Sequence, residues 1–333
     1  MRKKNTYFIS SPGGIEEKIF VPINGQEQYL HLRGRNVNNP VILCLHGGPA
    51  SPDSFLTYEY IGALCDAYTL VSWDQRGCGR TYYKNAHLDP ENNTATFEQA
   101  VEDVDAVVRY LCQRFQKDSV ILLGHSYGTL LGTCYVAQHP ERISSYLGIG
   151  QSISIQATQA ENHREILSKL LPGDPETAKI QKAYSDYQAH PDLHHLNAFQ
   201  RLTIPCYPAK KPEARKKSQL RLILTSPDFA WDDLRWMLGM LNIQKHYTRN
   251  KQLMDYTLSA DLSQGTTDFS VPMYFLSGEC DRVCHVELTR RFFDSITAPD
   301  KKLLLIPGCG HSPQIDDPKQ FAAEIRKLLT CTE

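Results

Sequence analysis

The sequence carries almost no excess of charge of either sign. Its 36 Lys and Arg residues are balanced by 37 Asp and Glu residues, which leaves a formal net charge of −1 over 333 residues. A protein that holds nucleic acid or an anionic membrane surface needs a positive field. We therefore expect neither a nucleic-acid partner nor a membrane partner, and the oligomeric state stays open.

Long apolar runs are missing as well. Nowhere does the chain contain the run of about eighteen apolar residues that a membrane-spanning helix requires. Residues 6–14 also lack the apolar stretch of a secretory signal peptide. These absences predict a cytoplasmic protein.

The ten cysteines lack the C-x-x-C spacing that zinc sites and redox motifs often use. In a long chain without an export signal, free and mostly buried thiols are expected rather than disulfides. A zinc site would have to combine residues of two separate loops, namely Cys280, Cys284, His285, Cys309 and His311. We expect no metal ion.

What is present is a composition typical of a folded globular protein, with 41% hydrophobic and 22% charged residues. Short apolar runs at 41–45, 68–73, 120–123 and 143–149 each end at a glycine-rich or polar turn. Runs of this length are typical of buried parallel strands. Two further runs, 18–23 and 28–33, flank Asn24-Gly25, a dipeptide that predicts a hairpin.

The chain also alternates strands with helices. Apolar residues recur at helical spacing over 97–115, behind a capping box formed by Thr96 and Gln99. Strand-like runs return at 271–277 and 302–306, and helical patterns at 286–296 and 318–329. We therefore predict a discontinuous α/β core of residues 1–150 and 267–333, interrupted by a polar helical cap at 151–266.

The sharpest motif is Gly-His-Ser-Tyr-Gly at 124–128, directly after a predicted strand. A G-x-S-x-G sequence at a strand-to-helix junction places its serine on a strained turn, and the flanking glycines permit close packing. This context predicts Ser126 as a nucleophile.

A serine hydroxyl needs a base and an acid that orients the base. The strand at 271–277 runs into Glu279 and Asp281, and the strand at 302–306 leads to His311. Enzymes with a G-x-S-x-G elbow place the serine, the acid and the histidine in this order along the chain. By this order His311 is the candidate base and Asp281 the preferred acid, and Glu279 is the alternative acid.

Acyl transfer also requires hydrogen-bond donors for the developing oxyanion. The loop His-Gly-Gly-Pro at 46–49 follows the strand at 41–45 and can direct a backbone N–H into the site. We assign the oxyanion hole to the backbone N–H groups of Gly48 and Tyr127.

These motifs together resemble the proline iminopeptidase branch of the α/β-hydrolase superfamily. The resemblance rests on His-Gly-Gly-Pro at 46–49, Trp-Asp-Gln-Arg-Gly-Cys-Gly-Arg at 73–80 and the pentapeptide at 124–128, together with Asp281 and His311. It implies an α/β-hydrolase core, a mostly parallel sheet with flanking helices, carrying an inserted helical cap. It also implies a serine hydrolase without cofactor that removes an N-terminal residue from small peptides or amides.

Members of the branch recognise the substrate's free amine with carboxylates of the cap. The candidates in this chain are Glu161, Glu165, Asp228, Asp232 and Asp233. The sequence departs from the family at Ala50, where glycine is usual, and at Thr81, where serine is usual.

Other functions stay open at this point. A carboxylesterase or lactonase would use the same three catalytic residues, so the core does not separate it from an aminopeptidase. An epoxide hydrolase or haloalkane dehalogenase normally carries aspartate at the elbow, and Ser126 argues against both. A homologue that only binds a ligand would be expected to lack one of the three residues.

Overall fold

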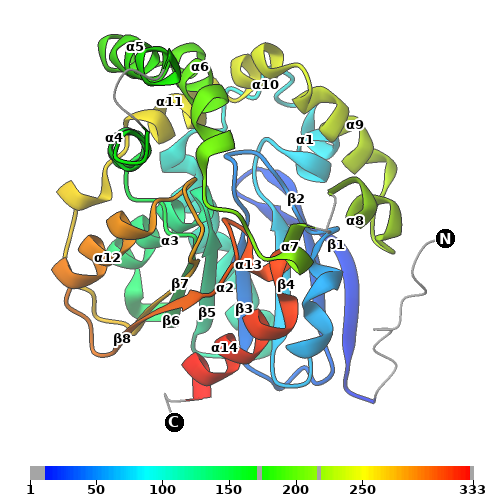
Figure 1. The fold of residues 1–333 in the computed structure, drawn as a ribbon. Helices are drawn as coiled ribbons and strands as arrows, with labels where there is room; N and C mark the ends of the chain where they lie inside the picture. The colour runs from blue at the N-terminus through cyan, green and yellow to red at the C-terminus, as the bar shows by residue number, and fades with distance from the viewer. Residues whose placement is uncertain (1–11, 171–174, 216–218, 331–333) are drawn as a thin grey trace.

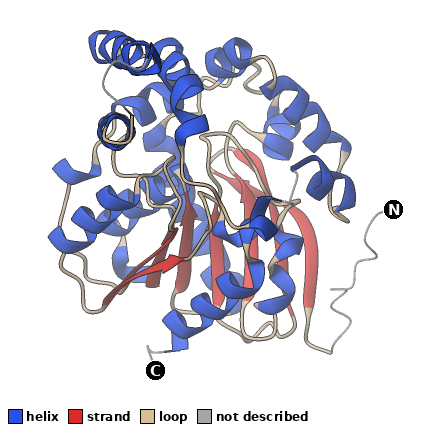
Figure 2. Ribbon diagram, in the orientation of Figure 1, coloured by secondary structure: helices blue, strands red, loops and turns tan. Residues whose placement is uncertain are grey.

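An eight-stranded sheet forms the centre of the computed structural model, which describes residues 12–170, 175–215 and 219–330. The strand order is β1-β2-β4-β3-β5-β6-β7-β8. The strands are β1 Ile15–Ile23, β2 Gln26–Gly34, β3 Val41–Leu45, β4 Thr69–Asp74, β5 Val120–His125, β6 Ile143–Ile149, β7 Met273–Gly278 and β8 Lys301–Ile306. From β4 to β8 all neighbours pair in parallel, and helices enclose the sheet (Figure 2). The predicted α/β fold class is confirmed.

The opening hairpin is also confirmed. Asn24 and Gly25 have φ values of 44° and 80°, the positive values that a two-residue type I′ turn requires. The turn sets Ile23 opposite Gln26, and β2 then pairs antiparallel with β4. The hairpin therefore forms the antiparallel edge of the sheet.

The apolar runs coincide closely with the strands. The runs at 41–45 and 143–149 match β3 and β6 without any shift, and every residue of β3 is buried. Parallel strands are covered on both faces, which is why they carry continuous apolar residues.

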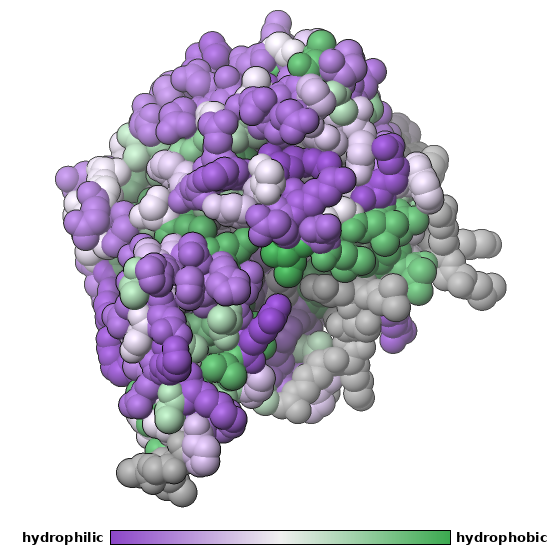
Figure 3. All heavy atoms as spheres, turned by 90° about the horizontal axis from the view of Figure 1, so that it is seen from above, coloured by the Kyte–Doolittle hydropathy of each residue, from purple (hydrophilic) through white to green (hydrophobic). Residues whose placement is uncertain are grey.

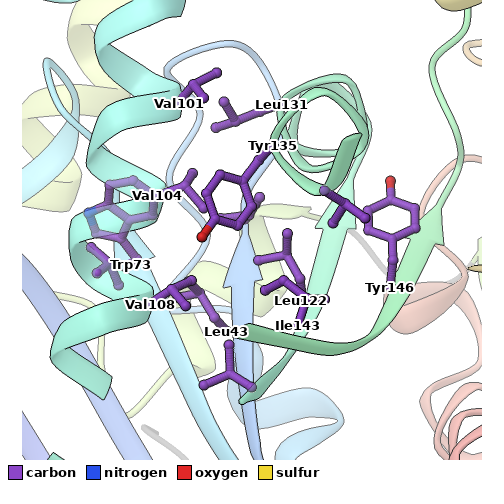
Figure 4. Close-up of a cluster of buried hydrophobic side chains, with 14 of the residues drawn as sticks. Leu43, Trp73, Val101, Val104, Val108, Leu122, Leu131, Tyr135, Ile143 and Tyr146 are labelled. Atoms are coloured by element: carbon purple, nitrogen blue, oxygen red, sulfur yellow. The ribbon is translucent and has the colours of Figure 1, made fainter. Parts of the chain in front are cut away.

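Two hydrophobic clusters lie on the two faces of the sheet. The core helices are α1 Gly79–Asn85, α2 Phe97–Phe115, α3 Tyr127–Gln138, α12 Val286–Ser295, α13 Pro313–Asp316 and α14 Pro318–Thr330. Val104 of α2 and Leu131 of α3 pack with Leu43 and Leu122 of the sheet (Figure 4). Side chains of α14 form the second cluster with the other face. The carboxyl ends of the parallel strands are left free to carry loops.

The predicted capping box of α2 is only half formed. The Thr96 Oγ1 accepts from the backbone N–H of Gln99 at 3.1 Å. The Gln99 side chain instead donates to the buried Asp103 carboxylate at 3.0 Å. Asp103 lies one turn further along the same helix, so a contact within α2 takes up the Gln99 side chain in place of the second half of the box.

Between β6 and β7 the described chain is mainly helical. Its helices are α4 Ile155–Leu167, α5 Pro175–Ala189, α6 Leu193–Thr203, α7 Pro212–Arg215, α8 Gln219–Thr225, α9 Trp231–Met240, α10 Ile243–Arg249 and α11 Lys251–Ser259. In Figure 1 helices α5, α6, α9 and α10 lie above the sheet. A bridge between Ser154 and Asp261 joins the two ends of this stretch. We call residues 151–266 the inserted segment.

The upper surface is mostly hydrophilic, crossed by a band of hydrophobic residues (Figure 3). Exposed apolar side chains of the inserted segment include Leu224, Leu238 and Leu241. Among the described residues, the helices are all too short or too polar to cross a membrane.

Candidate active site

Ser126 occupies a strained turn between β5 and α3. Its φ is 54° and its ψ is −121°, backbone angles that residues other than glycine rarely adopt. The Ser126 N–H donates to the carbonyl of Ile149 at 3.0 Å, which ties the turn to β6. Strain of this kind persists only where the surrounding structure holds it, and it is typical of functional sites.

The glycines of the pentapeptide permit this turn. A Cβ on Gly128 would lie 2.2 Å from the carbonyl oxygen of Leu45. A Cβ on Gly124 would lie 2.4 Å from the carbonyl oxygen of Gly128. Because both contacts are with backbone atoms, neither can be relieved by a side-chain rotation. The turn therefore requires glycine at both positions.

His311 and Asp281 meet beside the serine. The His311 Nδ1 lies 2.9 Å from the Asp281 Oδ2, which leaves the Nε2 of the imidazole for another partner. The other oxygen of the fully buried Asp281 accepts from the backbone N–H groups of Val283 and Cys284, at 2.9 and 3.0 Å. The carboxylate is thus fixed from both sides and orients the ring.

Glu279, the rival acid, points elsewhere. It is exposed, and its Oε2 accepts from the backbone N–H of Gly308 at 3.2 Å. Although Glu279 and Asp281 are two residues apart, the geometry brings only Asp281 to His311.

Gly150 makes room for this pair, a role that sequence reasoning missed. A Cβ on Gly150 would lie 3.0 Å from the His311 Nδ1 and 3.2 Å from the Asp281 Oδ2. Its φ of 57° also favours glycine. The available signal was a glycine at the carboxyl end of a predicted strand.

The loop after β3 approaches the serine closely. A Cβ on Gly47 would meet the Ser126 Cβ at 3.0 Å, and Gly48 lines the same cavity as Ser126. Tyr127 is the first residue of α3, where backbone N–H groups have no acceptor within the helix. Of the two predicted oxyanion donors, Gly48 therefore lines the cavity that contains the serine, and Tyr127 follows the serine directly in the chain.

Two neighbouring histidines stay neutral. Burial lowers the pKa of His125 to about 4 and that of His46 to about 4. The His125 Nε2 lies 3.0 Å from the carbonyl oxygen of His311, so a neutral ring can donate to the backbone of the candidate base. Burial also raises the pKa of Cys284 well above its ordinary value, so this thiol, a neighbour of Ser126, stays protonated.

Ser126 and His311 line one cavity of about 390 Å³. Its walls are largely apolar and come from both the core and the inserted segment. They include Phe55, Leu56, Ile223, Trp236, Met237 and Met240. Val283 lines the cavity as well and is 51% exposed, so the cavity opens to the surface beside it. A small substrate with an apolar part fits such a space.

Of the five candidate carboxylates of the inserted segment, only Asp233 lines this cavity. Glu161 pairs with Arg291, and Glu165 pairs with Arg282. Asp228 is buried but pairs with Arg33 at 2.6 Å. Asp232 lies on the outer side of α9 and pairs with Arg235.

Asp233 combines burial with an unused acceptor. Its Oδ2 accepts from Arg80 at 2.5 Å, whereas its Oδ1 is buried without a hydrogen-bond partner in the described structure. Burial raises the pKa of Asp233 to about 6 although Arg80 lies beside it. The free oxygen can accept from a ligand in the cavity.

The residues considered for a zinc site do not come together in the described structure. Within the described ranges, the cysteines and histidines of the two loops form no group of three metal-ligating atoms. Two such groups lie elsewhere in the described chain. One is Asp105, His139 and Glu141. The other is Glu16, His31 and Asp228, and it already surrounds the Arg33 guanidinium, which donates to His31 and Asp228.

Comparisons with known proteins bear on the family and the fold of the chain. The alpha/beta hydrolase fold family model matches residues 40–318. The chain is 26% identical to the probable aminopeptidase YbaC of Bacillus subtilis (strain 168) over 309 residues, 90% of this chain and 92% of that protein. It is 26% identical to the proline iminopeptidase of Lactobacillus helveticus over 317 residues, 93% and 96% of the two chains.

Solved structures add a likeness of fold. The crystal structure of the proline iminopeptidase of Mycobacterium smegmatis superposes with a TM-score of 0.64 at 19% identity, covering 95% of this chain and 98% of that chain.

Proposed function

The chain belongs to the alpha/beta hydrolase fold family, and from this membership and the site geometry we propose that it is a serine hydrolase acting through an acyl-enzyme. The observation that carries the proposal is the 2.9 Å contact of His311 with the buried Asp281 beside the strained Ser126. In this scheme Ser126 is the nucleophile, His311 the general base and Asp281 the positioning acid.

The reaction proceeds in two stages. The Ser126 Oγ attacks the substrate's carbonyl carbon while its proton passes to the His311 Nε2. The backbone N–H groups of Gly48 and Tyr127 stabilise the oxyanion. His311 then protonates the leaving group, whose bond to the carbonyl carbon breaks. Water, deprotonated by the His311 Nε2, then attacks the acyl carbon. The ester bond to the Ser126 Oγ breaks, and the Oγ takes the proton back from His311 as the acid product leaves.

We further propose that the enzyme is an aminopeptidase that releases the N-terminal residue of small peptides or amides. Relatives named aminopeptidase and proline iminopeptidase support this, as does the position of Asp233 in the cavity. A buried ammonium group requires a carboxylate partner. The unused Oδ1 of Asp233 supplies an acceptor for it. The inserted segment acts as a cap that excludes large folded substrates.

The deciding measurement compares kcat/KM for an aminoacyl arylamide with that of its N-acetylated form. A site that pairs with the amine should reject the acetylated form by about 100-fold or more. Asp233→Asn should lower kcat/KM for the free amine, because the amide keeps an acceptor for Arg80 but loses the charge. Asp232→Asn, one residue away on the outer side of α9, is the matched control and should have no effect.

Equal rates for the two arylamides would reject the aminopeptidase assignment. Turnover of simple acyl esters alone would favour a carboxylesterase or lactonase, which uses the same three residues.

A further inference from the structure

A second carboxylate lines the active-site cavity from the core side. Asp53 lies in the loop after β3, and its side chain borders the same cavity as Ser126 and Asp233. Among the described residues, no side chain forms a hydrogen bond or ion pair with this carboxylate. The proposed mechanism does not use it.

Gln314 lines the same two cavities as Asp53. Both residues line the main cavity, and both also line a small adjoining hollow of about 10 Å³ between the core and α14. Gln314 is 6% exposed, and its Oε1 is buried with no hydrogen-bond partner in the described chain. The wall that both residues line therefore carries a carboxylate without a side-chain partner and an amide oxygen without a donor.

The groups around Asp53 do not neutralise it. Arg80 is already committed to Asp233, to Ser54 and to the backbone of Asp228. The titratable groups that interact with Asp53 from neighbouring elements are Asp74 of β4, Cys44 of β3, Tyr60 and Cys78. None of these is a cation, and the Asp74 charge opposes that of Asp53. Burial, with a smaller contribution from Asp74, raises the pKa of Asp53 to about 7.

A partly buried carboxylate that lines the same cavity as an unpaired amide oxygen is suited to a ligand that brings positive charge and several N–H donors. Ammonium and guanidinium groups meet both conditions. Asp233 lies on α9 and Asp53 in the loop after β3, so the two carboxylates reach the cavity from different elements.

We propose that Asp53 and Gln314 form a second acceptor subsite, which binds an ammonium or guanidinium group of the substrate's first side chain while Asp233 receives the α-amine. The inference rests on the proposed aminopeptidase function and names its substrate class: amides of amino acids with a basic side chain.

The test is a substrate pair that differs only in the side-chain charge. Lysyl and norleucyl p-nitroanilides have side chains of similar length, and only lysine ends in an ammonium group. The wild-type ratio of kcat/KM, lysyl over norleucyl, should exceed about 10, because the neutral chain leaves both acceptors unpaired. Asp53→Asn should bring this ratio close to one.

Two further variants serve as a second test of the subsite and as a control. Gln314→Leu removes the second acceptor without touching Asp53 and should also lower the ratio. Asp66→Asn changes an exposed carboxylate that pairs with Arg35 outside the cavity, so it should keep the wild-type ratio. Melting temperatures of all variants show whether each one folds.

Calorimetry separates binding from turnover. Lysinamide should bind the Ser126→Ala protein more tightly than norleucinamide does, and Asp53→Asn should abolish the difference. Selective binding without hydrolysis of either arylamide by the wild type would overturn the aminopeptidase function alone. Equal binding and equal kcat/KM of the two side chains would overturn the subsite alone. An unchanged ratio in Asp53→Asn would also overturn it.

Discussion

Replacement of Asp281 by asparagine isolates the role of one oxygen atom. The Oδ1 of Asp281 accepts from two backbone N–H groups, while the Oδ2 faces the His311 Nδ1. Asparagine can keep its carbonyl oxygen on the two N–H groups, so the loop retains these bonds. Its NH2 group then faces the Nδ1 and cannot accept a proton from it. The imidazole is driven to the tautomer whose Nε2 carries the proton.

In that tautomer His311 cannot remove the Ser126 proton. We expect kcat to fall about 10⁴-fold, which corresponds to about 5 kcal/mol of lost transition-state stabilisation. KM should change far less, because Asp281 is fully buried and acts through His311. Steady-state kinetics with an aminoacyl arylamide measure both constants, and a melting curve shows that the fold is kept.

Glu279→Gln is the matched control for this prediction. Glu279 is exposed and contacts the backbone of Gly308, so the amide should keep full turnover. Wild-type turnover in Asp281→Asn together with an inactive Glu279→Gln would refute the reasoning and transfer the acid's role to Glu279.

Four further predictions follow from the geometry. A fluorophosphonate probe should label Ser126, and Ser126→Ala should lose the label in mass mapping and several orders of magnitude in kcat; full activity would contradict the mechanism. Gly128→Ala should abolish soluble, active enzyme, because the new Cβ would overlap the Leu45 carbonyl; a normal melting curve would refute this. Ala50→Gly should raise stability by about 1 kcal/mol in denaturant unfolding, because Ala50 has a φ of 60°. Asp53→Asn should be more stable than the wild type at pH 8 by up to about 4 kcal/mol, and no more stable near pH 3. The raised pKa of Asp53 makes its ionisation cost stability as pH rises from the unfolded value through about 7, so a gain at low pH alone would contradict the burial argument.

Local patterns in the sequence determined most of the core. Apolar runs of five to seven residues predict β3 and β6 correctly. A parallel strand is covered on both faces, so its own side chains form a continuous apolar run that is visible in the sequence. The hairpin turn was equally predictable, since the positive φ values at Asn24 and Gly25 follow from the residues themselves. The elbow around Ser126 belongs to the same class, because its glycines and its serine are adjacent in the chain.

The tertiary structure decided every question that depends on where a side chain points. Asp281 and Glu279 both follow β7, and only the packing of the β8 loop turns one of them toward His311. The sequence offered five carboxylates of the inserted segment on equal terms, and the path of α9 over the core brings Asp233 alone to the cavity.

Asp53 and Gln314 were not predicted at all. They lie more than 250 positions apart in the chain. Asp53 belongs to the loop after β3 and Gln314 to the short helix α13, and neither segment carries a sequence motif. Periodicity and motifs report on neighbours in the chain, whereas a binding cavity is formed by residues that meet only after the sheet, α13 and the inserted segment have packed together. The place where Asp53 and Gln314 line one cavity was therefore a property of the folded chain.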